Sequence, residues 1–310
     1  KGLINAVLRK AVADVTGKWD KSPVQMLPKW LRNPLREAYG NGTIMAIETA
    51  HMRGAPVDLT VTGDLETWAS TLGGTPLANG SLRLGEIGQI SALEGFAEGK
   101  WWVQDAAAAW PAAALAVTPG ETVLDVCAAP GGKTMQMAAQ GGVLTALDIS
   151  ASRMERVAEN LARTQLAAEL VVANILEWQD PRQFDAVLLD APCSATGTIR
   201  RHPDLPFAKD GTGISELIEL QTHMLNATAG RVKPGGKLVF CTCSLIPDEG
   251  EVQAENFLRR HKDFTVDTSL PQGMDPAWRT EEGGFRLRPD YWSELGGMDG
   301  FYLIRMNRRG

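Results

Sequence analysis

The chain has 310 residues, of which 44% are hydrophobic and 22% charged, a usage typical of globular proteins that argues against a disordered chain. It contains no apolar run of about 18 residues, which excludes a membrane-spanning helix, and four cysteines are too few for a disulfide framework, so we expect a reducing, cytoplasmic setting. The net charge of −6 argues against a protein that coats nucleic acid through bulk positive charge. Residues 1–38, however, carry eight Lys or Arg against three Asp or Glu, and this segment could contact a phosphate backbone.

The N-terminal third predicts helices, a linker and a small α/β unit. Residues 2–13 carry apolar side chains at helical spacing, and residues 17–35 contain the glycine and prolines of a linker. Residues 36–98 mix helical and strand patterns without evident chemistry. The elements expected there are helices over 43–51 and 65–72 and a strand over 57–62.

From about Lys100 the pattern changes to alternating strands and helices, which predicts an α/β fold: a parallel sheet with helices on both faces. Ser152 and Glu155 match a capping box that opens one of the helices. Residues 283–289 and 300–304 predict a late hairpin that completes the sheet. Strands are expected over 123–126, 143–147, 170–173, 186–189 and 237–242, and helices from Lys133, from Ser152, over 214–231 and over 249–260.

The segment Leu124–Lys133, LDVCAAPGGK, joins a strand to a helix through a glycine turn and suits a nucleotide-like ligand. A P-loop would need glycine where Cys127 stands, and the dinucleotide pattern G-x-G-x-x-G is absent, so neither ATP nor NAD is the expected ligand. Asp148 ends the next strand, where an acid can bind both ribose hydroxyls. Together these features favour S-adenosylmethionine; a plain structural turn and a helix-capping acid are the alternatives.

Two further strand ends carry cysteines. Asp190-Ala-Pro-Cys-Ser194 stands where amino-group methyltransferases carry Asn/Asp-Pro-Pro-Tyr/Phe, and the cysteine there favours methylation at carbon through covalent activation. Cys241 and Cys243 share one face of a strand; Cys243 is a candidate nucleophile, whereas we expect Cys241 to be a small buried side chain. A proline turn with a buried thiol at Cys193, and a zinc site, are the alternatives, but C-x-C alone is a weak zinc signal.

Basic residues follow the Cys193 loop. Arg200, Arg201 and His202 could hold the phosphates of a strand whose base enters the cleft, or they could form an ordinary solvated loop.

With these motifs the chain resembles the RNA cytosine-C5 methyltransferases of the Nol/Nop/Sun type. The resemblance extends over essentially the whole chain and is strongest from Val103 to Glu251, with the block Asp190–Asp204 the most specific. It implies a Rossmann-like class I S-adenosylmethionine-dependent methyltransferase domain over 99–310, a linker and small α/β subdomain over 21–98, and a remnant of a NusB-like helical RNA-binding domain over 1–20. It also implies a monomer without metal.

The family pattern implies roles for single residues. Cys243 is the expected nucleophile, Cys193 assists release of the product, and Asp190 orients the cytosine and protonates its N3. The family's usual aspartate at the adenine is replaced here by Asn174, whose carbonyl oxygen can still accept a hydrogen bond. The expected cofactor contacts are Cys127, Ala128, Ala129, Pro130, Gly131, Gly132, Lys133, Asp148, Arg153, Asn174 and Asp190.

The implied activity is methyl transfer from S-adenosylmethionine to C5 of an unstacked cytosine in small-subunit (16S) ribosomal RNA, with S-adenosylhomocysteine as the other product. Transfer RNA or large-subunit ribosomal RNA as substrate, and a non-catalytic RNA-binding factor on the same scaffold, are the alternatives. The segment Arg200–Asp204 and the N-terminal remnant favour small-subunit RNA.

Overall fold

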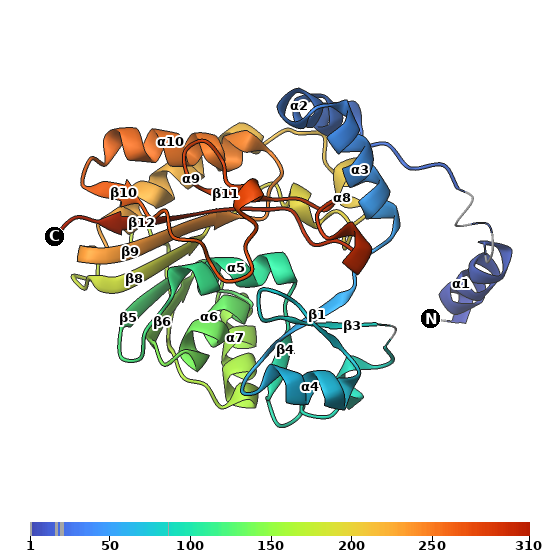
Figure 1. The fold of residues 1–310 in the computed structure, drawn as a ribbon, viewed down its shortest axis with the longest axis horizontal. Coiled ribbons are helices and arrows are strands. Elements are labelled where there is room, and N and C mark those ends of the chain that lie inside the picture. Colours follow the sequence, from blue (N-terminus) through green and yellow to red (C-terminus); the bar gives the residue numbers. More distant parts are fainter. Residues whose placement is uncertain (1, 16–17, 19–21, 86) are drawn as a thin grey trace.

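The computed structural model describes residues 2–15, 18, 22–85 and 87–310 (Figure 1). The helices are α1 (Gly2–Val15), α2 (Lys29–Tyr39), α3 (Asn41–Met52), α4 (Leu65–Leu72), α5 (Ala106–Leu115), α6 (Gly132–Ala139), α7 (Ala151–Thr164), α8 (Leu205–Ala208), α9 (Ile214–Ala229) and α10 (Glu251–Arg260). The strands are β1 (Val57–Val61), β2 (Thr75–Pro76), β3 (Leu82–Leu84), β4 (Trp101–Val103), β5 (Thr122–Val126), β6 (Val143–Asp148), β7 (Glu169–Val172), β8 (Phe184–Asp190), β9 (Val232–Thr242), β10 (Phe264–Val266), β11 (Phe285–Leu287) and β12 (Phe301–Arg308). Within these described ranges, no helix is both long and apolar enough to cross a membrane.

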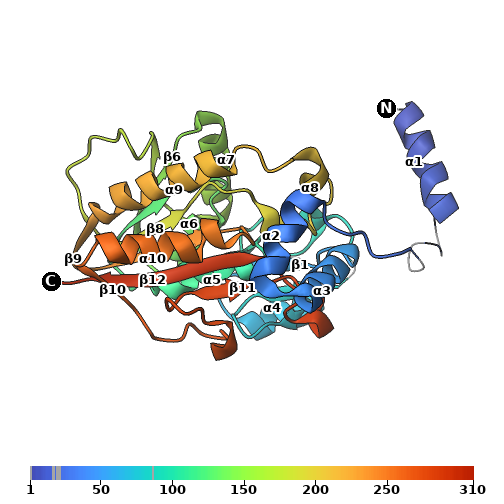
Figure 2. The same cartoon turned by 90° about the horizontal axis from the view of Figure 1, so that it is seen from above.

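The large sheet confirms the predicted α/β fold. Its strands run in the order β10-β12-β9-β8-β5-β6-β7, and neighbours from β7 to β9 pair in parallel. The predicted late hairpin is also confirmed, because β11 and β9 both pair antiparallel with β12. Helices α5, α6 and α7 lie on one side of this sheet and α9 and α10 on the other (Figures 1 and 2).

Buried side chains on both faces explain why the central strands are almost continuously apolar. Leu124 and Val126 of β5 pack towards the α9 side, and Val123 packs towards α5. Residues that alternate along a strand point to opposite faces, so each face needs its own apolar set. The parallel strands therefore end together at one edge, where the predicted site residues lie.

Helix α5 was not among the expected elements. Its sequence AAAAWPAAAL is apolar on every side, so it has no amphipathic period to detect, and Trp110 within it is fully buried. Asp105 caps the helix by accepting a hydrogen bond from the Ala107 backbone N–H at 2.8 Å.

The capping box predicted at Ser152 is wrong by two residues. The N-cap of α7 is Ser150, whose hydroxyl accepts a hydrogen bond from the Arg153 backbone N–H at 3.4 Å. Asp148 at the end of β6 accepts from the Ser150 N–H at 2.9 Å, so the chain turns into the helix directly after the strand.

The small α/β unit is divided differently from the sequence expectation. Its sheet has the order β2-β3-β1-β4, and β4 lies beyond the expected boundary at residue 98. Helices α2 and α3 instead pack on the large domain: their buried leucines and isoleucines share a core with Ile199, Leu245 and Ile246. The boundary expected at residues 20 and 21 lies outside the described residues.

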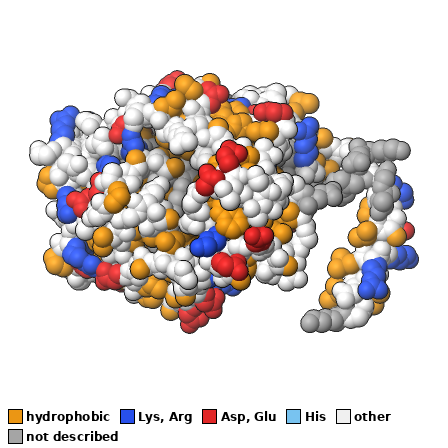
Figure 3. Space-filling view, turned by 60° about the horizontal axis from the view of Figure 1, so that its bottom comes forward, with side chains coloured by type: hydrophobic (Ala, Val, Ile, Leu, Met, Phe, Trp, Pro, Cys, Tyr) orange, Lys and Arg blue, Asp and Glu red, His pale blue; other side chains and the backbone are white. Residues whose placement is uncertain are grey.

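The side chains of α1 are all exposed, and the helix stands away from the rest of the chain in Figures 1 and 2. On the face shown in Figure 3, Lys and Arg side chains are scattered among Asp and Glu and do not gather into one basic area. This mixed surface agrees with the net charge of −6.

Candidate active site

The turn after β5 forms a backbone cradle at the start of α6. Cys127 and Gly131 adopt positive φ values of 63° and 99°, and the Gly131 N–H donates to the Ala128 carbonyl at 2.8 Å. A Cβ at Gly131 would lie 3.2 Å from Val157 Cγ1 of α7, so only a residue without a side chain fits this turn easily. The first N–H groups of α6, which have no partner within the helix, follow directly after this turn.

Asp148 joins this cradle to the end of β6. Its buried carboxylate accepts hydrogen bonds from the Ala129 N–H at 3.2 Å and the Ser150 N–H at 2.9 Å. Arg153 lies 3.3 Å from the same carboxylate and also donates to the Ala129 carbonyl. The predicted residues Ala129, Asp148 and Arg153 are thus brought together.

Asn174 lies just beyond β7, near Asp148, because the Ala173 N–H donates to the Asp148 carbonyl at 3.1 Å. Its side-chain oxygen accepts from the Leu176 N–H at 3.1 Å and its amide nitrogen donates to Glu177 at 3.3 Å. These contacts hold its own turn, and one lone pair of the oxygen is left for another donor.

Lys133 of α6 and Asp190 of β8 form an ion pair. Lys133 Nζ lies 2.8 Å from Asp190 Oδ2 and 5.2 Å from the centre of the Phe301 ring. Burial opposes the charge of Lys133, but Asp190 outweighs it and raises the pKa of the lysine. Lys133 lies in the predicted cofactor loop, but its ion pair with Asp190 was not predicted from the sequence.

Cys193 and Cys243 meet at the ends of β8 and β9, with their sulfur atoms 3.4 Å apart. Backbone hydrogen bonds fix the two loops, since the Ala191 and Gly197 N–H groups both donate, at 3.0 Å, to the carbonyls of Cys241 and Cys243. The hydrogen bond with Cys243 and burial raise the pKa of the Cys193 thiol well above its usual value. Cys193 therefore keeps its proton at neutral pH and can donate it to Cys243.

Cys241 is fully buried in the core, as expected, and its thiol also donates to Asp190 Oδ1 at 3.5 Å. Asp190 therefore has one oxygen towards Lys133 and the other towards Cys241.

Sequence reasoning missed two buried carboxylates beside the site, Asp125 and Glu249. Asp125 Oδ2 accepts from the Thr134 hydroxyl at 2.6 Å, while its buried Oδ1 has no hydrogen-bond partner among the described residues. Burial raises the pKa of Asp125 to about 7. An acid inside an apolar strand was the available signal for Asp125; no local pattern distinguishes Glu249.

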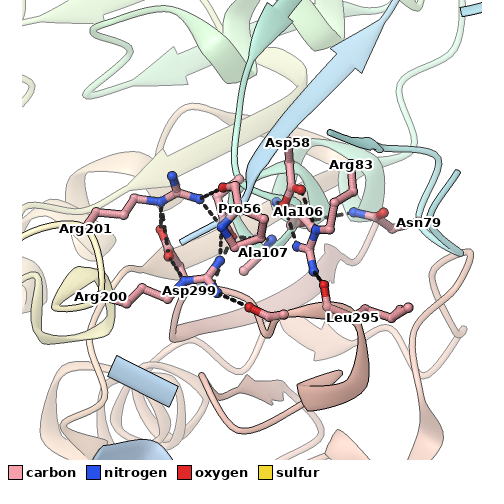
Figure 4. Close-up of polar contacts among 12 residues, drawn as sticks. Pro56, Asp58, Asn79, Arg83, Ala106, Ala107, Arg200, Arg201, Leu295 and Asp299 are labelled. Atoms are coloured by element: carbon pink, nitrogen blue, oxygen red, sulfur yellow. Dashed lines mark hydrogen bonds and ion pairs between the residues drawn. The ribbon is translucent and has the colours of Figure 1, made fainter. Parts of the chain in front are cut away.

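The expected RNA contact at Arg200 is corrected by the structure (Figure 4). Its side chain has no exposed surface and lies 2.7 Å from Asp105 and 2.6 Å from Asp299. A guanidinium bound to two carboxylates in the interior cannot reach a phosphate. Arg201 binds the same two carboxylates and is 26% exposed, and His202 is exposed.

A family model and several known proteins match most of this chain. A family model described as 16S rRNA methyltransferase RsmB/F matches residues 112–307. Ribosomal RNA small subunit methyltransferase B of Pasteurella multocida is 38% identical, over 99% of this chain and 72% of that protein. The protein of that name from Vibrio cholerae is 37% identical, over 100% of this chain and 73% of its own length. A crystal structure of a methyltransferase homolog protein from Pyrococcus horikoshii aligns with a TM-score of 0.73 at 28% identity, covering 91% of this chain and 95% of that one.

Proposed function

The chain belongs to the RsmB/F family of 16S rRNA methyltransferases, and we propose that it methylates C5 of a cytosine in small-subunit ribosomal RNA through a covalent adduct with Cys243. As a member of this family it is an S-adenosylmethionine-dependent methyltransferase. The observation that carries the finer proposal is the contact between Cys193 and Cys243, whose sulfur atoms lie 3.4 Å apart. Transfer to an amine needs no thiol, whereas transfer to C5 of a pyrimidine needs a nucleophile to activate the ring.

The cradle residues fit S-adenosylmethionine. A side chain at Gly131 would be strained by its positive φ and crowded by Val157 of α7, and Asp148 has its carboxylate beside this turn. We assign the adenosine and methionine to Cys127–Lys133, the ribose to Asp148 with Arg153 nearby, and the adenine amino group to Asn174. When bound, the cofactor supplies an electrophilic methyl group.

The chain's own residues would then activate the base. The Cys243 thiolate adds to C6 of the cytosine, which makes C5 nucleophilic enough to take the methyl group. The C5 proton passes to water, the electrons of the C5–H bond restore the double bond between C5 and C6, and the bond between C6 and sulfur breaks with its electrons returning to Cys243. The products are 5-methylcytosine and S-adenosylhomocysteine. Asp190 orients the base, and Cys193, which keeps its proton, assists release of Cys243.

The RNA must present the cytosine outside its stack, because C6 is not accessible to a thiolate within a duplex. Arg201 and His202 remain our proposed contacts to the flanking phosphates, and Arg200 is not.

Methyl-labelled S-adenosylmethionine and unmodified 16S rRNA test this proposal on one denaturing gel with wild type, Cys193→Ala and Cys243→Ala. We expect labelled RNA with wild type, a shifted protein–RNA band with Cys193→Ala, and neither with Cys243→Ala, although Cys243→Ala still binds the cofactor. Transfer RNA and 23S rRNA in parallel lanes test the substrate. Labelled RNA from Cys243→Ala would refute the covalent mechanism.

A further inference from the structure

The carboxylate of Glu249 lies between the loops that carry the two cysteines. Glu249 Oε1 accepts hydrogen bonds from the Ser194 backbone N–H at 2.8 Å and from Gln221 Nε2 at 3.0 Å. Its Oε2 accepts from the hydroxyls of Ser194 and Ser244, the latter at 2.6 Å. The residue has no exposed surface.

Each serine follows a cysteine directly in the chain. Ser194 comes after Cys193 on the β8 loop, and Ser244 comes after Cys243 on the β9 loop. The two hydroxyls also lie 3.1 Å from each other, and Ser244 Oγ accepts from the Ile246 N–H at 3.0 Å. The buried carboxylate of Glu249 therefore links the residue after Cys193 to the residue after Cys243.

A buried carboxylate is costly unless donors satisfy it, and here both oxygens are satisfied by groups of these loops and of α9. Removing it would leave the Ser194 N–H and the Gln221 amide buried without this acceptor. The loops would then keep only the ties that do not involve Glu249, such as the backbone hydrogen bonds from Ala191 and Gly197, and the sulfur atoms could shift relative to each other.

We infer that Glu249 is a positioning residue for the proposed methyl transfer: it holds the Cys193 and Cys243 loops together so that both sulfur atoms reach the same base. The inference rests on the proposed function. The Glu249 carboxylate faces the serines and Gln221, so it acts through them and does not touch the reacting atoms.

The first test is the single-turnover rate of methyl transfer, with enzyme in excess and saturating cofactor, for wild type, Glu249→Gln and Glu249→Ala. This rate constant does not depend on the fraction of folded enzyme. We expect Glu249→Ala to lower it by about 100-fold, the effect of misplacing a reacting group by about 1 Å. Glu249→Gln keeps one acceptor oxygen and should restore part of the rate. Cofactor affinity should change by less than about threefold for both variants, because the cradle does not involve Glu249.

Glu48 provides a matched control. It is also a buried glutamate that accepts from a backbone N–H and a side chain, at 2.9 Å from Leu27 N and 2.8 Å from Arg32 Nε, but it lies on α3. Glu48→Gln should lower the melting temperature and leave the single-turnover rate unchanged. Equal rates for Glu249→Ala and wild type, with only stability reduced, would overturn the inference. Should Glu249→Ala not fold, Ser244→Ala, which removes one of the four donors, takes its place.

A second readout is independent of methyl transfer. A trivalent arsenical that bonds two neighbouring thiols measures whether Cys193 and Cys243 are held together. We expect tight binding to wild type, binding at least about tenfold weaker to Glu249→Ala because the two thiols lose their effective concentration, and unchanged binding to Glu48→Gln. If Glu249→Ala loses the arsenical binding that wild type shows, the positioning role is supported. If wild type at the same time transfers no methyl group, the proposed function is refuted. Absence of binding to wild type, or equal binding to Glu249→Ala, would refute the positioning role.

Discussion

The sulfur atoms of Cys193 and Cys243 are joined by a hydrogen bond at 3.4 Å, although 50 residues separate them in the chain. Parallel strands bring this about, because β8 and β9 are neighbours and both end at the same edge of the sheet. Because the two thiols are so close, both can act on the same base. For the same reason, an oxidant can join them in a disulfide.

We expect glutathione disulfide to oxidise this pair. Cys243 attacks the disulfide and releases one glutathione thiol; Cys193 then displaces the second, leaving a disulfide between the two cysteines. Mass spectrometry should find a loss of two hydrogens and a cross-linked pair of peptides, and dithiothreitol should restore the methyl transfer that is lost. A stable mixed disulfide with glutathione at Cys243 would contradict this expectation.

Gly197→Ala should damage the site without altering a reactive group. A Cβ there would lie 1.9 Å from the Gly300 carbonyl oxygen and 2.9 Å from that of Cys243. We expect a loss of at least about 2 kcal/mol in the free energy of unfolding, together with reduced methyl transfer, because the Cys243 backbone must move. Gly42→Ala, where a Cβ meets nothing within 4 Å, is the control and should be close to neutral by urea denaturation.

Arg200→Met should destabilise the fold by about 3 to 5 kcal/mol, because it leaves Asp105 and Asp299 buried with only Arg201 to compensate them. Arg182 is also bound by two carboxylates but is 42% exposed, so Arg182→Met should cost far less. Urea titration compares the two.

His202→Ala should leave stability unchanged and weaken RNA binding, because this side chain is exposed on the loop after Arg201. Filter binding with labelled 16S rRNA measures the effect. Unaltered affinity would remove His202 from the RNA contacts.

Asp125 should make stability fall as the pH rises. The unfolded carboxyl releases its proton near pH 4, whereas burial raises the folded pKa to about 7, so the folded state binds more protons between these values. Asp125→Asn does not titrate. The free energy of unfolding of Asp125→Asn minus that of wild type, measured by urea titration, should therefore increase by roughly 2 to 3 kcal/mol from pH 5 to pH 8. A difference that does not change with pH would contradict the raised pKa of Asp125.

The sequence predicted the large sheet and the strand ends because period and apolar runs are local properties of β5, β8 and β9. It did not predict α5, whose uniform apolar surface has no period, or the burial of Arg200, which depends on Asp299 far along the chain. Glu249 was missed for the same reason: its partner Ser194 is 55 residues away, and the contact exists only after the strands are assembled.

The packing of α2 and α3 has a consequence for how the protein is made. Their apolar side chains are covered by Leu245 and Ile246, and Tyr39 donates to the Leu245 carbonyl at 2.7 Å across 206 residues of sequence. At a synthesis rate of about 5 to 20 residues per second, these helices leave the ribosome roughly 10 to 40 s before their partner surface exists. During that interval a growing chain carries an uncovered hydrophobic face, and the loop after Cys243 is what finally covers it.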